Sequence, residues 1–336
     1  MPGATRAALP AALLVAGLVA GCGSNGRPAQ PVVALPIAPA PAPPTEPTAA
    51  AGTVTPLGAP ATQVAVDPPT ATVVVALADP PRLLLSTLDG TAPPRQVPLP
   101  GPAADLVLAA DGGPLLVPVS TPGSLVRVPL DGGPPSTTDL DGPAYGAIAM
   151  GQTTVVAMGD RLTVLDGSSS RTIPGFVDAT RLVPAGSKVG VLDRGRSAVS
   201  LVDISSDDAG PALRAGDGPA AAVSDRFDRM LVTDVRDGEL LAFAGDPLLL
   251  RQRFPLPGAP YGVAYDARRD LAWVTLTARN EVVGLNVAGG EPVVVHRFPT
   301  VHQPDAVAVD PASGRVVVVS ASGAGLQVID PERVVR

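Results

Sequence analysis

The chain has 336 residues, a formal net charge of −7, 46% hydrophobic residues and only 3% aromatic residues. Because it carries 41 prolines and 36 glycines, long helices cannot run through it, and many short strands separated by turns are favoured. The acidic balance, without any cluster of Lys or Arg, excludes nucleic acid as a partner.

The N-terminal residues form an export signal. Residues 7–20 follow Arg6 and carry no charge, a run too short to span a bilayer but typical of a secretory hydrophobic region. The next residues, Leu18-Val19-Ala20-Gly21-Cys22, resemble the lipobox of bacterial lipoproteins. The resemblance implies cleavage between Gly21 and Cys22 and acylation of Cys22. The alternative is an ordinary signal peptide with a chance cysteine.

A proline-rich segment follows the signal. Cys22 is the only cysteine, so the exported domain can form no disulfide. From Pro28 to Ala51 the sequence is almost wholly Pro, Ala, Val and Thr. At ~3.1 Å per residue, some 25 to 30 extended residues reach roughly 75 to 95 Å. We therefore predict a signal peptide at residues 1–21, a lipidated cysteine and disordered tether at 22–51, and a folded domain at 52–336.

The folded domain consists of repeated units, each opened by a proline. The gaps between these prolines are 42, 41, 76, 41 and 44 residues, and we interpret the gap of 76 as two units, the hidden one beginning near Asp178-Ala179-Thr180. Units of about 40 residues match a four-stranded propeller blade. The sequence therefore predicts an all-β, seven-bladed β-propeller of four-stranded antiparallel blades. The opening prolines are Pro60, Pro102, Pro143, Pro219, Pro260 and Pro304.

Small residues in the first strand of each unit are expected to line a central channel, where the strands crowd together. They are Ala65, Ala104, Ala147, Ala149, Ala222, Ala264 and Ala308. A ring left open would expose two strand edges. Either Gly52–Leu57 or Arg333–Arg336 could close it by adding the outer strand of the last blade; we favour Gly52–Leu57.

Two resemblances to known families support this fold. The last unit contains Ala306-Val307-Ala308-Val309-Asp310-Pro311 and Val328-Ile329-Asp330, which resemble the repeat of the YVTN or YncE-like seven-bladed propeller family. Several segments between residues 190 and 330, among them Ala259-Pro260-Tyr261-Gly262, are similar to actinobacterial lipoproteins of the LppL type. These resemblances imply a lipoprotein with a propeller and carry no catalytic residues.

Three kinds of enzymatic site were weighed. Lactonase propellers hold a hard cation with several oxygen ligands, whereas the glutamates here, at 46, 239, 281, 291 and 332, avoid the opening strands. Quinoprotein propellers repeat a tryptophan motif, and Trp273 stands alone. A Ser-His-Asp site would have only His296 and His302 as its base. We predict no cofactor and no metal, leave the catalytic residues unknown, and favour a protein that is not an enzyme.

The loops that enter the first strands, and those between second and third strands, are expected to share one face. Aromatic residues and arginines on that face suit recognition, although Asp and Arg also serve as ordinary turn and rim residues. The candidate binding residues are Tyr145, Tyr261, His302, Gln303, Asp305, Asp193, Arg194, Arg236 and Arg279.

The leading hypothesis is a binding or scaffolding module of the bacterial cell envelope, anchored by lipid to the extracytoplasmic face of the cell membrane. Its partners would be the membrane, through the anchor, and either an envelope protein or a small-molecule ligand. The alternative is a hydrolase or lactonase acting on a small molecule in the central funnel. Three or more Asp, Asn or Glu side chains converging on the axis would favour the enzyme.

Overall fold

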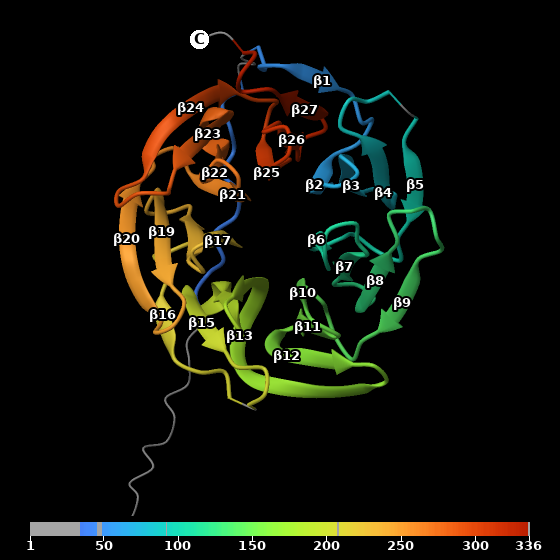
Figure 1. The fold of residues 1–336 in the computed structure, drawn as a ribbon, viewed down its shortest axis with the longest axis vertical. Helices are drawn as coiled ribbons and strands as arrows, with labels where there is room; N and C mark the ends of the chain where they lie inside the picture. The colour runs from blue at the N-terminus through green and yellow to red at the C-terminus, as the bar shows by residue number, and fades with distance from the viewer. Residues whose placement is uncertain (1–33, 46–48, 92, 207, 335–336) are drawn as a thin grey trace, which may run out of the picture. The chain divides into compact units, whose positions relative to one another are not determined.

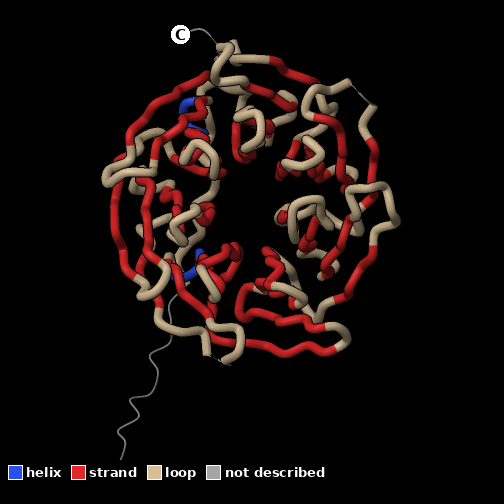
Figure 2. Tube along the Cα trace, viewed as in Figure 1, coloured by secondary structure: helices blue, strands red, loops and turns tan. Residues whose placement is uncertain are grey.

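A computed structural model of the chain describes residues 34–45, 49–91, 93–206 and 208–334, all within a compact unit that spans residues 33–336. The predicted signal peptide, with Gly21 and Cys22, lies outside the described residues. Two short 3-10 helices accompany the strands, η1 (Arg194–Arg196) and η2 (Thr277–Arg279) (Figure 2). Among the described residues, no helix has the length and apolarity needed to cross a membrane.

Five four-stranded antiparallel sheets surround a common centre (Figure 1). This confirms the predicted propeller architecture of four-stranded blades. In order along the chain, the blades are formed by β2 (Ala61–Asp67), β3 (Thr72–Ala78), β4 (Pro81–Thr87) and β5 (Arg95–Pro98); by β6 (Val107–Leu108), β7 (Leu115–Val119), β8 (Ser124–Val128) and β9 (Ser136–Asp139); by β17 (Pro219–Ser224), β18 (Met230–Asp234), β19 (Glu239–Ala244) and β20 (Leu249–Pro255); by β21 (Pro260–Asp266), β22 (Leu271–Leu276), β23 (Glu281–Asn286) and β24 (Val293–Pro299); and by β25 (Pro304–Val309), β26 (Val316–Ser320), β27 (Leu326–Ile329) and β1 (Thr53–Thr55).

The prediction of seven four-stranded blades is wrong, because the structure has five such blades and one larger sheet. That sheet has seven strands: β10 (Gly146–Met150), β11 (Thr153–Ala157), β12 (Gly159–Asp166), β13 (Ser169–Ala185), β14 (Lys188–Asp193), β15 (Ala198–Val202) and β16 (Ala212–Arg214). Its middle strand, β13, runs for 17 residues and pairs with β12 and then with β14.

The junction between the two repeats lies inside β13. In the other units a proline stands at or just before the first strand, but proline alone does not end a strand in this chain, because Pro174 and Pro184 both lie within β13. Here Asp178 and Ala179 stand at that position, and Ala179 pairs with Gly159 on β12 and with Asp193 on β14. The outer strand of one repeat therefore continues directly into the inner strand of the next, and the two repeats share one sheet.

Apolar side chains fill the spaces between neighbouring sheets. Strand β26 is buried along its whole length, and so are β7 and β22. A strand covered on both faces reads as a continuous apolar run instead of an alternating one. Because each sheet packs on both neighbours, the inner strands are fixed in position around the axis.

The ends of the ring are joined by β1, which pairs antiparallel with β27. This confirms Gly52–Leu57 as the closing segment. The fully buried Gln327 reinforces the joint: its Nε2 donates to the carbonyls of Ala51 (2.7 Å) and Pro299 (3.0 Å), and its Oε1 accepts from the Val301 N–H (2.9 Å). One side chain thus links the N-terminal segment, the β24–β25 loop and the last strand.

Replacing Gln327 by Ala should lower the free energy of unfolding by about 3 kcal/mol, because buried backbone groups lose their partner. Chemical denaturation followed by the fluorescence of Trp273 measures the change. The control is Gln96→Ala on β5, an exposed position, which should change stability by less than ~0.5 kcal/mol. Equal effects of the two substitutions would contradict the role assigned to Gln327.

Candidate functional site

A central cavity of about 650 Å³ lies inside the ring of sheets. Its wall comes mainly from β2, β6, the second half of β13, β17, β21 and β25, the first strands of six repeats, whereas β10 contributes none of the lining residues. Of the alanines predicted to line it, five do so: Ala65, Ala104, Ala222, Ala264 and Ala308. Ala147 is instead fully buried. Much of the wall is therefore apolar, but polar side chains, among them Thr62, Ser224 and Tyr265, also line it.

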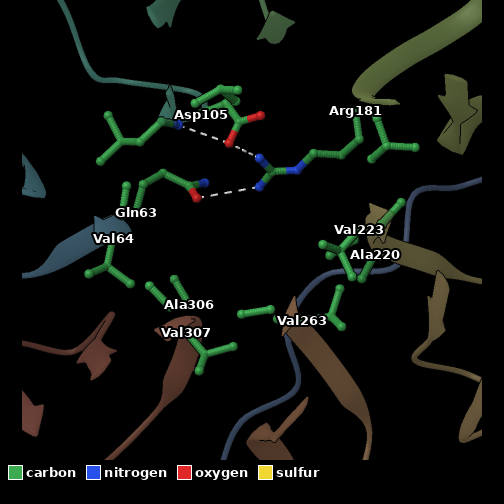
Figure 3. A pocket seen from close by; sticks show the side chains of 18 of the residues that line it. Gln63, Val64, Asp105, Arg181, Ala220, Val223, Val263, Ala306 and Val307 are labelled. Carbon is green, nitrogen blue, oxygen red and sulfur yellow. Dashed lines mark hydrogen bonds and ion pairs between the residues drawn. The ribbon is translucent and has the colours of Figure 1, made fainter. Parts of the chain in front are cut away.

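Three of the polar side chains in the wall form one network (Figure 3). Arg181 on β13 forms an ion pair with Asp105, in the loop before β6, and donates to Gln63 Oε1 on β2 (3.4 Å). Gln63 Nε2 donates to the Ala104 carbonyl (3.0 Å), and Asp105 Oδ1 accepts from the Leu106 N–H (2.9 Å). The network joins three repeats across the cavity and places a positively charged group in its wall.

Four of the predicted binding residues also line the cavity: Tyr145, Tyr261, Arg194 and Asp305. Tyr261 and Asp305 lie at the starts of β21 and β25, and Tyr145 immediately precedes β10. Arg194, in η1, comes from a loop between second and third strands. Four of the nine candidate residues, drawn from both kinds of loop, thus line the cavity.

Asp305 is the carboxyl at this mouth whose ionisation the fold changes most clearly. Burial raises its pKa to about 6, while hydrogen bonds from Thr277 Oγ1 (3.3 Å) and Gln303 Nε2 (3.4 Å) partly oppose the shift. Burial dominates because a charged carboxylate loses more solvation than these two long bonds restore. Asp305 can therefore exchange a proton near neutral pH.

The remaining candidates form the surrounding loops. His302 Nδ1 lies 2.8 Å from Ser322 Oγ, and the Gln303 N–H donates to Asn280 Oδ1 (2.9 Å). Arg279 is exposed on η2. Arg236 donates to the carbonyls of Asp217 (2.9 Å) and Pro36 (2.7 Å). These side chains share the face with the cavity mouth but are not part of the cavity wall.

Asp193 supports a loop rather than presenting a free carboxylate. It is 1% exposed, and its oxygens accept the backbone N–H groups of Val177 (2.8 Å), Asp178 (2.9 Å) and Arg196 (3.1 Å). Its carboxylate therefore links the backbone of β13 to that of η1. The structure therefore separates Asp193 from the ligand-facing residues.

One group of carboxylates has the spacing of a metal site. Oxygens of Asp234, Asp237 and Glu239 lie within 4.8 Å of one another. However, Asp234 accepts N–H groups from Asp217 and Gly218 (both 2.9 Å), and Arg253 contacts Glu239 (2.7 Å). Burial and the neighbouring carboxylates raise the pKa of Asp237. These contacts account for the cluster as support for the β18–β19 turn.

The Arg181 network was missed by sequence reasoning, although a signal existed. Arg181 is followed by two apolar residues in a first strand, and Asp105 follows two alanines in another opening segment. A charged side chain in a strand that lines a crowded channel requires a buried partner. The arginine in this strand could therefore have indicated the site.

Known structures share this fold. A hydrazine synthase from Kuenenia stuttgartiensis is 14% identical, with a TM-score of 0.69, covering 85% of this chain and 97% of that one. Virginiamycin B lyase from Staphylococcus aureus is 13% identical, with a TM-score of 0.66 and coverage of 82% and 97%. The β-propeller domain of Cps50 (Swd1) from Myceliophteria thermophila is also 13% identical, with a TM-score of 0.70 and coverage of 82% and 98%.

No protein-family model and no curated protein matches the sequence. The identities to the solved structures show the fold alone. The chain is therefore a β-propeller whose function has to be argued from its own residues.

Replacing Arg181 by Met should lower the free energy of unfolding by about 3 kcal/mol, because Asp105 is left buried without its partner. The double substitution Arg181→Met/Asp105→Leu should recover most of this loss, since no buried charge remains. Thermal or chemical denaturation of both variants measures the coupling. Additive losses in the double variant would show that the two side chains do not act as a pair.

Asp305 predicts a pH dependence of stability. Its pKa of about 6 in the fold exceeds the usual value near 3.9, so the native state holds its proton more tightly, and stability falls as pH rises from about 4 to 6. Asp305→Asn should therefore be about 1 kcal/mol more stable than wild type at pH 8, after allowance for solvent screening. This advantage should disappear at pH 4; a difference independent of pH would contradict it. Denaturant titrations at both pH values test the effect.

Proposed function

We propose that the protein is a lipid-anchored β-propeller that acts as a binding or scaffolding module on the extracytoplasmic face of the bacterial cell membrane. The observation that carries this proposal is the grouping of Tyr145, Tyr261 and Arg194 at one mouth of the central cavity. Aromatic rings and guanidinium groups provide contact area and directed donors in protein interfaces. Three separate repeats supply these side chains, as expected for a composite recognition surface.

The location rests on the sequence. The lipobox-like residues Leu18 to Cys22 and the uncharged segment before them support export and acylation at Cys22. The similarity of residues 190–330 to LppL-type lipoproteins, and of the last repeats to the YVTN family, agrees with an anchored propeller. Burial of the acyl chains in the bilayer would supply the membrane contact.

The composition of the cavity wall favours binding over metal-dependent chemistry. Among the described lining residues, the carboxylates are Asp105 and Asp305, and Asp105 is engaged by Arg181. A hard cation needs more oxygen ligands than this pair provides. The ligand would be either an envelope protein that covers the mouth or a small molecule that enters it.

A capture experiment tests the proposal. Wild type and a Tyr145→Ala/Tyr261→Ala variant are cross-linked in cells and recovered from the membrane fraction, and captured proteins are compared. We expect a partner held by wild type to be lost in this variant, because both rings lie at the mouth. The matched control is Tyr265→Phe, which changes the tyrosine at the opposite end of β21 and should retain the partner.

A Cys22→Ser variant forms the second arm of the same experiment. Without the sulfur that is acylated, the protein should leave the membrane fraction. Retention of Cys22→Ser in the membrane, or identical capture by wild type and the double tyrosine variant, would contradict the anchoring and the binding face, respectively.

The alternative is an enzyme acting on a small molecule in the cavity, and one observation favours it. With a pKa of about 6 at the cavity mouth, Asp305 has the protonation behaviour of a general acid or base. A hydrolase or lactonase reaction would then lose activity in Asp305→Asn. A panel of esters and lactones, assayed between pH 5 and 8 with wild type and this variant, separates the two functions.

A further inference from the structure

Part of the predicted tether lies against the propeller. Residues 34–45 pass beside β17 and β21 in Figure 1, as the blue segment at the start of the described chain. The Leu35 N–H donates to the Gly195 carbonyl (2.7 Å) in η1. Further along, Asn280 Nδ2 donates to the Pro44 carbonyl (3.4 Å). The segment therefore contacts loops from three successive repeats. We call the surface that it contacts the groove; its residues are Arg194, Gly195, Gly218, Arg236 and Asn280.

Two arginines donate hydrogen bonds to backbone carbonyls of this segment. Arg236 donates to the Pro36 carbonyl and Arg194 to the Ala38 carbonyl, both at 2.7 Å. A polyproline II helix forms no internal hydrogen bonds, so its carbonyls remain available to such donors. Guanidinium groups suit this task because they present several N–H donors in a rigid plane.

The groove also has a position, next to Gly218, that admits only a small side chain. Ala38 is 2% exposed, and a Cβ added to Gly218 would lie only 2.7 Å from the Ala38 Cβ. Leu35, three residues earlier, is half-buried, whereas Pro36, Ile37 and Pro39 are exposed. A spacing of three matches the turn of a polyproline II helix, which presents every third residue to the same side. The groove therefore combines a glycine, Gly218, that leaves room for Ala38 with two arginines that donate to backbone carbonyls.

We propose that this groove is a binding site for an extended, proline-rich peptide, and that residues 34–45 are its resident ligand. The contacts select the backbone conformation and one small side chain, so a proline-rich segment of another polypeptide with the same pattern can exchange with the resident segment. This inference goes beyond the function proposed for the cavity and does not depend on Cys22 or on a membrane partner.

The first test uses the full chain and a fluorescent synthetic peptide with the sequence of residues 34–45. In wild type the tethered segment competes at an effective concentration on the order of millimolar, so the added peptide should bind poorly. Ala38→Trp cannot fit over Gly218 and should release the resident segment. We expect the peptide to bind Ala38→Trp at least tenfold more tightly than wild type, measured by fluorescence anisotropy. Equal binding to both proteins would overturn the proposal.

Substitutions in the groove complete the test, each made in the Ala38→Trp chain. The larger side chain of Gly218→Leu occupies the space that the Ala38 side chain of the peptide needs, and should abolish peptide binding. The matched control is Gly289→Leu, where an added Cβ meets nothing within 4 Å, and it should leave binding unchanged. Arg236→Ala, a partly exposed side chain whose loss leaves the core intact, should weaken binding roughly tenfold by removing a charged hydrogen bond. Binding that is unaffected by Gly218→Leu and Arg236→Ala would place the peptide elsewhere and overturn the assignment.

Hydrogen exchange gives an independent measure of the resident segment. The Leu35 amide should be protected in the wild-type full chain, because it donates to Gly195, and should exchange at least tenfold faster in Ala38→Trp. Fast exchange in wild type would show that residues 34–45 do not occupy the groove. The cavity proposal would survive that result, since its test depends on Tyr145 and Tyr261.

Discussion

Closure of the ring is the constraint on which the other features depend. Among the described residues, each sheet packs mainly on its two neighbours, so the ring is complete when the first and last repeats meet. That joint consists of the β1–β27 ladder and the three hydrogen bonds of Gln327. Because β1 comes from the N-terminal side of the chain, closure also fixes the residues that precede it. The ladder that completes the last blade therefore brings the proline-rich segment next to the propeller loops.

Sequence periodicity predicted the elements well, because strand length, turns and apolar runs are local properties. It failed at the boundary between the two repeats that share β13. At Asp178 and Ala179 the opening proline of the other repeats is missing, and β13 continues across the boundary. It also failed for long-range polar contacts. The ion pair of Arg181 with Asp105 joins residues far apart in sequence, and no local pattern identifies the partner, although a charge in a channel strand signals that one is needed.

The residues of the candidate face differ in what they contact, and the binding role of the face stays a prediction. Tyr145, Tyr261 and Asp305 line the cavity, whereas the carboxylate oxygens of Asp193 accept hydrogen bonds from backbone N–H groups. Aspartate in a turn can serve either role, and the choice depends on whether N–H groups of a neighbouring loop point at it. Asp234 follows the same rule with Asp217 and Gly218. Asp193 and Asp234 thus hold loops, whereas Tyr145 and Tyr261 line the cavity.

Binding of residues 34–45 changes the geometry expected of an anchored propeller. The composition alone suggested a reach of roughly 75 to 95 Å for a fully free tether. If the groove holds its resident segment, only residues 22–33 separate the proposed acylation site from the propeller, and such a length spans at most about 40 Å. Release of the segment would lengthen the tether. Arg194 would stay engaged on exchange, because a carbonyl of the incoming peptide takes the place of that of Ala38 and its Nε keeps its hydrogen bond to the Pro219 carbonyl (3.2 Å). Peptide binding in the groove would then control the distance of the propeller from the membrane.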